Sequence, residues 1–391
     1  MLNRRLLRAK AVQSLYAYLQ CQQSDYELAL DKIASDFLPD LNSMEVQDPV
    51  KLAEGKELAQ KLFKEQYLNK KLTLDCSVST KVEKSAAEAI RFYHQALKKD
   101  YDNLSRSLIC ETEKIFDNYL RFLLLLIALG AQAKKEHQDH LNRKFTRVTV
   151  AHYTFKLANN PILAKLAAHN TLKDEALRRN IAWDNELVRE WYKLLLKEEF
   201  YKQYRSLSET TPEDELNIIL TIAKRFILTN NAVVAYFEEN DINWTDNMPV
   251  VKNMAIKTIK RIAEAPIGEQ IALQKLSPNW QDDKEYLIEL FAKGVEEAAF
   301  AQQMIAERTQ NWDIDRITIL DKVILNLAIS EMIHFPSIPV KVTINEFIEI
   351  SKLYSTPKSY FFVNGLLNTI ATDLQQSGKV KKSGRGLIDN K

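Results

Sequence analysis

The segment from Trp312 to Leu374 restricts the possible folds more than any other part of the chain, because three consecutive amphipathic helices can be read from it. In the first helix, apolar residues recur at steps of three and four, which places them on one face. These residues are Ile317, Leu320, Ile324, Leu327 and Ala328. Pro336 and Pro339 separate this helix from the next. The segment therefore predicts a compact bundle of helices.

Local signals also predict where the second and third helices begin. Thr343 stands three residues before Glu346, which is the spacing of a capping box. Thr356-Pro357 predicts the start of the third helix, because proline is tolerated at the first helical position. Gly365 falls inside that helix, where glycine costs about 1 kcal/mol relative to alanine. We expect such a glycine to mark the close approach of another backbone or of a ligand.

The composition extends the helical prediction to the whole chain. Only 8 glycines and 10 prolines occur in 391 residues, whereas folds rich in β-structure need more turn residues. The hydrophobic share of 46% allows a substantial core. The formal net charge is +2, so any nucleic-acid site must come from local clustering of cations. We therefore predict an all-α protein of two or three domains.

Membrane and secretory signals are weak. The chain starts with an arginine-rich segment without an apolar region, so we expect no signal peptide. The longest apolar run, Phe122–Leu129, has eight residues, far fewer than the roughly 20 that span a bilayer. A buried helix is the simpler interpretation, and we expect a cytoplasmic protein that does not contact a membrane.

No residue pattern indicates catalysis. A glycine-rich phosphate loop is missing, and Cys21, Cys76 and Cys110 stand too far apart for a metal or redox motif. His137 and His140 could share a helix face, but no cysteine or carboxylate completes a metal site with suitable spacing. The sequence predicts a protein that is not an enzyme and has no cofactor and no bound metal.

The amino-terminal helix, about Arg4 to Gln22, carries a cluster of cations. Arg4, Arg5 and Arg8 fall in the same angular sector as the apolar stripe that follows them, and Lys10 adds a fourth charge. Short basic segments of this kind are typical of phosphate binding. From charge alone, a solvated helix start is the alternative.

The ordered residues of the carboxy-terminal region resemble the NusB family of transcription antitermination factors. The resemblance rests on Asp315-Arg316, Asp321, Glu331, Ile338-Pro339, Lys341-Val342, Ile344-Asn345-Glu346, Glu349, Lys352 and Phe362-Val363-Asn364-Gly365. Residues 4–16 are similar to the arginine-rich amino terminus of that family. The order and separation of these motifs are specific, although each helix alone would be an ordinary core helix.

The resemblance implies an RNA-binding surface for boxA RNA. Its residues would be Arg4, Arg5, Arg8, Lys10, Tyr18 and Lys341. Leu6 stands where many members carry another arginine, and Ala9 where many carry glutamate. Tyr18 takes the place of a family aromatic residue and could stack on a base or pack against the next helix.

The resemblance also implies a protein partner. NusB proteins bind RNA jointly with NusE, a ribosomal protein, and modify RNA polymerase on ribosomal RNA operons by assembly rather than catalysis. The positions that match the partner-facing region are Lys358, Ser359, Phe362 and Gly365. Lys358 replaces an acidic residue that some members carry.

The resemblance divides the chain into four parts. Residues 1–37 and 284–375 form one NusB-like helical bundle, residues 38–283 form a large inserted helical domain, and residues 376–391 form a disordered basic tail. Because insertions at exposed loops cost little, we expect that the protein without residues 40–280 still folds.

Two other functions remain open from the sequence. NusB-like domains also occur fused to ribosomal RNA cytosine methyltransferases, but such enzymes need a following α/β domain with a cofactor loop and a catalytic cysteine. A helical scaffold that binds proteins and has lost RNA affinity is the second alternative, and Leu6 and Ala9 are compatible with it.

Overall fold

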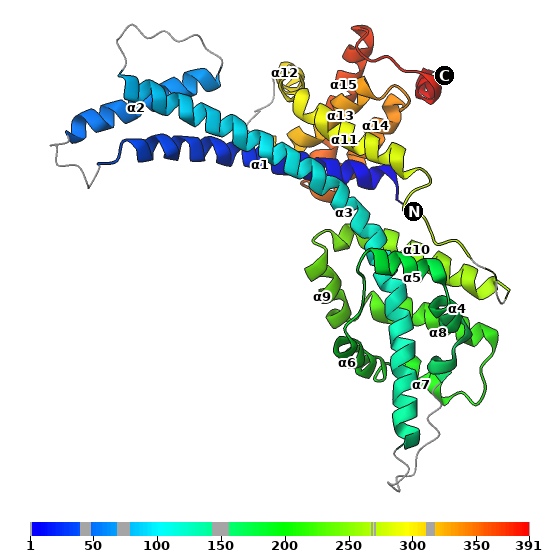
Figure 1. Cartoon of the computed structure of the whole chain (residues 1–391). Helices are drawn as coiled ribbons and strands as arrows, with labels where there is room; N and C mark the ends of the chain where they lie inside the picture. Colours follow the sequence, from blue (N-terminus) through cyan, green and yellow to red (C-terminus); the bar gives the residue numbers. More distant parts are fainter. Residues whose placement is uncertain are drawn as a thin grey trace. The chain divides into compact units, whose positions relative to one another are not determined.

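The computed structural model of the chain describes residues 2–39, 48–68, 79–142, 156–266, 269, 271–309 and 317–390. Within these ranges every regular element is a helix, which confirms the predicted all-α fold (Figure 1). Cys76, Trp312 and Asp315-Arg316 lie outside the described residues.

The described helices follow one another in a single order along the chain. Their bounds are α1 (Arg4–Asp36), α2 (Pro49–Tyr67), α3 (Thr80–Asn142), η1 (Lys156–Asn159), α4 (Pro161–Ala167), α5 (Asn170–Arg178), α6 (Asn185–Leu195), α7 (Glu199–Ser206), α8 (Pro212–Thr221), η2 (Ile222–Ile227), α9 (Asn231–Asn240), α10 (Trp244–Glu264), α11 (Trp280–Glu296), α12 (Ala298–Arg308), α13 (Ile319–His334), α14 (Val340–Tyr354), α15 (Ser359–Gln376) and η4 (Gly384–Asn390).

The chain forms two compact units, each built from separate stretches. Unit 1 contains residues 1–6 and 110–284, and unit 2 contains residues 7–109 and 285–391. This division differs from the predicted domains, since residues 49–109 of the expected insert belong to the same unit as the NusB-like helices.

Helix α13 is the centre of unit 2. It packs against α12, α14 and α15, and apolar side chains are buried around most of its circumference. The buried set includes Val323, Ile324, Leu325, Leu327, Ala328, Ile329 and Met332. A helix that is apolar on all sides is stable only when other helices surround it, so α13 organises the bundle.

The second part of α1 forms another core of unit 2 together with α2 and the beginning of α3. Ala29, Ile33 and Phe37 pack with Phe63 of α2 and with Val82 of α3. Because α1 runs without a break to Asp36, it carries its apolar stripe from one core into the other. Helix α2 and the beginning of α3 therefore pack with α1 in unit 2, whereas the sequence placed them in an insert that starts at residue 38.

In unit 1, the later part of α3 supplies a central apolar stripe, which includes the run Phe122–Leu129 for which the sequence predicted a buried helix. Its fully buried residues include Ile115, Tyr119, Leu120, Phe122, Leu123, Leu125, Leu126 and Leu129. Among the described helices, α3 is long and apolar enough to cross a membrane, but core helices of soluble proteins pass the same test. The most apolar part of α3 is 56% buried inside the protein, which agrees with the buried-helix interpretation.

Two of the predicted helix starts differ from those observed. Helix α14 begins at Val340 after Pro339, so Thr343 is inside the helix and forms no capping box with Glu346. The Thr343 hydroxyl instead donates to Glu331 of α13 at 2.6 Å. Helix α15 begins at Ser359, two residues after Pro357, which is within the usual variation of helix ends.

The carboxy-terminal tail is ordered where the sequence predicted disorder. After α15, Lys382 donates its Nζ to the Phe335 carbonyl at 3.0 Å, and the Ser383 amide donates to the Pro336 carbonyl at 3.0 Å. The short helix η4 then packs on α14, as Figure 1 shows near the end of the chain. The tail lacks an apolar repeat, so no sequence pattern indicated these backbone contacts.

Candidate functional site

The two arginines at the start of α1 are accessible to solvent. Arg4 is 43% exposed in its side chain and lies 3.4 Å from the Asp283 carboxylate, an ion pair within unit 1. Arg5 is exposed as well. Exposed ion pairs are weak, so Arg4 could exchange this carboxylate for a phosphate at little cost.

Arg8 has the opposite environment and does not belong to a cationic surface. Its side chain is 3% exposed, and its guanidinium binds the Glu331 carboxylate in a bidentate manner, with Nε–Oε2 and Nη2–Oε1 distances of 2.7 and 2.9 Å. Tyr286 and Thr343 donate their hydroxyls to the same carboxylate. The predicted surface position of Arg8 is therefore wrong, because this buried group links α1 to α11, α13 and α14.

The protonation of Arg8 follows from this environment. Burial of the guanidinium lowers its pKa, but the negative charge of Glu331, supported by Tyr286 and Glu346, outweighs the burial and raises the pKa of Arg8 above its usual value. The Arg8 guanidinium therefore stays charged, and a charged group in this position requires the Glu331 carboxylate as its partner.

The other predicted RNA-binding residues, Lys10, Tyr18 and Lys341, differ in their exposure to solvent. Lys10 is 3% exposed, so its predicted surface position is also wrong. Tyr18 is half-buried, with its ring edge-on to Tyr101 and Phe291 at centroid distances of 6.2 and 6.3 Å. Burial and the neighbouring Tyr101 raise the pKa of Tyr18. Lys341 is exposed in the first turn of α14.

The predicted partner-facing residues divide in the same way. Ser359 is buried, and its hydroxyl donates to Asp321 at 2.9 Å, so it joins α15 to α13. Ser355 donates to the other oxygen of Asp321 at 2.7 Å. Lys358 is exposed and Phe362 is half-buried. Ser359 therefore organises the start of α15 and does not face a partner.

Gly365 lies on the exposed face of α15. A Cβ atom added there would meet no heavy atom within 4 Å, so nothing inside the described protein requires glycine at this position. Phe361, one turn earlier on the same face, is 65% exposed, and Leu353 of α14 is 69% exposed. We call Leu353, Phe361 and Gly365 the α14–α15 face.

Phe361 and Leu353 are exposed apolar residues that were not among the site residues predicted from the sequence. The stripe of α15 that is buried contains Val363, Leu366 and Ile370, and Phe361 falls outside it. The missed signal was an aromatic residue on the polar side of a helix, one turn before a glycine. Contiguous exposed apolar patches are typical of interaction surfaces.

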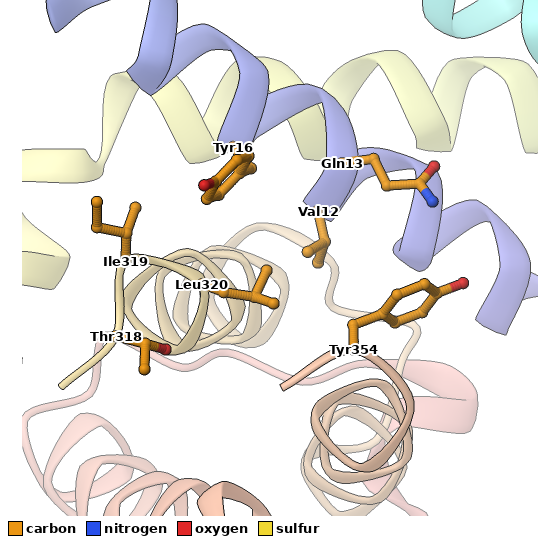
Figure 2. Close-up of a pocket in the computed structure, with 7 residues that line it drawn as sticks. All are labelled: Val12, Gln13, Tyr16, Thr318, Ile319, Leu320 and Tyr354. Atoms are coloured by element: carbon orange, nitrogen blue, oxygen red, sulfur yellow. The ribbon is translucent and has the colours of Figure 1, made fainter. Parts of the chain in front are cut away.

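A groove lies between α1 and the beginning of α13, within unit 2 (Figure 2). It has a volume of about 480 Å³ and is lined by Val12, Gln13, Tyr16, Thr318, Ile319, Leu320 and Tyr354. Figure 2 shows Val12 and Tyr16 projecting from α1 toward the start of α13. Its lining is largely apolar, and it holds no cluster of titratable groups.

Groups suited to metal or redox chemistry are not seen in the described part of the chain. No three histidine, cysteine or carboxylate side chains among the described residues converge as metal ligands. The cysteines that the structure describes, Cys21 and Cys110, are free thiols. Burial and the neighbouring Asp100 raise the pKa of Cys21, which makes its thiol less reactive at neutral pH.

Comparison with known proteins identifies the family. The model of the NusB family matches residues 250–372. The chain is 41% identical over 111 residues to the transcription antitermination protein NusB of Salinibacter ruber, a match that covers 28% of this chain and 68% of that protein. It is 39% identical over 106 residues to the NusB protein of Chloroherpeton thalassium, covering 27% and 50%.

The NusB protein of Bacillus pumilus is 34% identical over 125 residues, covering 32% of this chain and 95% of that protein. No solved structure matches the chain. The matches leave most of the chain uncovered, so they say nothing about the greater part of unit 1. Since the chain covers 95% of one NusB protein and 68% of another at 34% and 41% identity, it belongs to the NusB family.

Proposed function

We propose that the chain is a transcription antitermination factor that binds boxA-type RNA together with NusE. The complex would act on RNA polymerase that transcribes ribosomal RNA operons. The curated relatives are transcription antitermination proteins, and this supports the first part of the proposal. The factor works by assembly in the cytoplasm, without a catalytic step.

The observation that carries the proposal is the α14–α15 face. It combines an exposed phenylalanine, an exposed leucine and a glycine with open space in front of it. Apolar side chains beside a helix position without a Cβ let a partner approach closely. This face lies in the region that resembles the partner-facing region of NusB proteins, and NusE is the partner that we assign to it.

The RNA contacts in this proposal are fewer than the sequence predicted. Arg4, Arg5 and Lys341 are exposed and can reach phosphates, whereas Arg8 and Lys10 are buried. Tyr18 can present only the part of its ring that Tyr101 and Phe291 leave uncovered. We assign phosphate contacts to the exposed cations and a positioning role to Arg8.

The experiment is a binding titration with the purified chain, boxA RNA and NusE over a series of salt concentrations. We expect RNA and NusE to increase each other's affinity for the chain. Replacing Arg4 and Arg5 by alanine should reduce the slope of the logarithm of affinity against the logarithm of salt concentration by about 1.4 units, since each phosphate contact with single-stranded RNA contributes about 0.7 to that slope. A scrambled RNA of the same length is the control, and equal binding of both RNAs would contradict boxA recognition.

One observation favours a second function, a scaffold that binds proteins and not RNA. Only two exposed arginines remain at the start of α1, because Arg8 is used internally. In that case NusE would bind with normal affinity while boxA RNA would not bind at any salt concentration. The same titration therefore distinguishes the two functions.

A further inference from the structure

The tail after α15 is held in a defined position by contacts with the turn between α13 and α14. Lys382 and Ser383 donate to the carbonyls of Phe335 and Pro336. Gly386 lies so close to Pro336 that a Cβ atom at this position would clash with the Pro336 carbonyl oxygen. Only glycine fits against that carbonyl, so the docked position of the tail depends on Gly386.

Docking separates the cations of the tail into two groups. Lys382 is used by the Phe335 carbonyl, and the Lys379 ammonium lies 3.9 Å from the centre of the Phe300 ring. Lys381 and Arg385 are exposed, and neither forms an ion pair with any residue that the structure describes. Of the four cations between Lys379 and Arg385, two therefore anchor the tail and two face solvent.

These two cations lie at the same end of unit 2 as the first turn of α14. Pro336 is in contact with Gly386, and α14 begins only four residues later, with Lys341 exposed in its first turn. No acidic residue occurs between Lys379 and Leu387. We call Lys341, Lys381 and Arg385 the tail strip.

We propose that Lys381 and Arg385 of the tail strip bind the phosphates of RNA that continues beyond the boxA contact at Lys341. The inference rests on the proposed function, because it requires that the chain binds RNA. It goes beyond that function because it assigns a second backbone contact to the docked tail. Cations held by an anchored backbone lose less side-chain and chain entropy on binding than cations on a free tail, so docking strengthens each phosphate contact.

A protein partner is the competing occupant. Leu387 and Ile388 follow the strip in η4 and are exposed, and they would contribute to a protein contact but not to phosphate binding. We favour RNA because the strip has three cations and the anchoring contacts leave the two tail cations directed to solvent. The two occupants predict different effects for the cationic and the apolar residues.

The first test removes charge. The full chain, with NusE, is titrated with boxA RNA alone and with boxA RNA extended by a uridine tract on each side. We expect the extended RNA to bind more tightly, and Lys381→Gln/Arg385→Gln to abolish this advantage while binding of the short RNA is unchanged. For the extended RNA, the slope of the logarithm of affinity against the logarithm of salt concentration should become less steep by about 1.4 units in this variant. At about 50 mM salt this corresponds to a loss of affinity on the order of tenfold for each cation removed.

The matched control removes two exposed lysines from the other end of unit 2. Lys61 and Lys84 are exposed on α2 and α3, next to Leu62 and close to Val82, which pack with the carboxy-terminal part of α1. Helix α1 has 33 residues and is therefore about 50 Å long, with Arg8 and the α14 contacts near its other end. Lys61→Gln/Lys84→Gln has the same change in net charge and should keep the advantage of the extended RNA.

The second test keeps the charge and changes the position. Gly386→Val should displace the tail from Pro336, so the extended RNA should lose most of its advantage although Lys381 and Arg385 are intact. If the Lys381→Gln/Arg385→Gln variant still binds the extended RNA more tightly than the short RNA, the inference is overturned but the proposed function stands. If tighter binding of the extended RNA is lost only in the Leu387→Ser/Ile388→Ser variant, the tail makes a protein contact and the inference is overturned. If the wild type binds no RNA, both the inference and the proposed function are overturned.

Discussion

Arg5 and Arg8 are three residues apart on α1, but they should respond very differently to the same substitution. Arg8→Ala leaves the Glu331 carboxylate buried without its cation, and removing one partner of a buried ion pair costs about 3–5 kcal/mol. Arg5→Ala changes an exposed side chain and should stay within about 0.5 kcal/mol. The measurement is the free energy of unfolding in denaturant, and equal effects for the two variants would show that Arg8 is solvated in solution.

Gly365 gives a second prediction at the level of single residues, because its effects on stability and on binding should have opposite signs. Gly365→Gln places a good helix former at an open helical position and should stabilise the chain by up to about 1 kcal/mol. The same side chain should obstruct a partner on the α14–α15 face and weaken NusE binding at least tenfold. Thr372→Gln, two turns later on the exposed side of α15, is the control and should leave NusE binding unchanged.

At the level of helices, the contact between α1 and α3 should depend on pH through Asp25. Burial and the neighbouring Asp100 raise the pKa of Asp25, so folding favours its protonated form. The contribution of protonated Asp25 to the free energy of unfolding is therefore fully present below the aspartate pKa of the unfolded chain, about 3.9. This contribution is lost as pH rises through the higher pKa of Asp25 in the folded state.

Asp25→Asn should remove this loss, so the variant should gain stability relative to the wild type as pH rises from about 4 to 7. Thermal unfolding across that pH range measures the difference. Asp31→Asn, an exposed position on the same helix, is the control. A constant difference between Asp25→Asn and the wild type at all pH values would contradict the prediction.

Helix content and the central helices could be predicted because their signals are local. The stripe from Ile115 to Leu129 repeats with the helical period, and so does the first part of α13. The candidate site could be predicted only in part, because exposure depends on distant residues. Arg8 is buried by Glu331, which lies 323 positions away in the sequence, and no local pattern indicates that pairing. The tail is ordered by the Phe335 and Pro336 carbonyls, which have no sequence signature.

The division into two units predicts what can be removed from the whole molecule. Within unit 2, the rings of Tyr101 and Phe291 stack at a centroid distance of 5.5 Å. Unit 2 is interrupted after Ile109 of α3 and resumes at Glu285 of α11. Both of these chain ends therefore lie within a few helical turns of the Tyr101–Phe291 contact. Replacing residues 110–284 by a flexible bridge of roughly ten glycine and serine residues can therefore join the two ends of unit 2, since such a bridge extends to about 3.3 Å per residue.

This deletion should leave a helical protein that unfolds cooperatively and still binds NusE. The larger deletion of residues 40–280, which the sequence alone suggested, should behave differently, because it also removes α2 and the start of α3. Ala29, Ile33 and Phe37 would then be exposed on a helix without partners. Losing contacts of this size costs about 1.5–3 kcal/mol for each large apolar side chain, so this variant should aggregate or lose the carboxy-terminal part of α1. Circular dichroism and thermal unfolding of both variants test the prediction, and equal cooperativity would show that α2 and α3 do not contribute to the stability of unit 2.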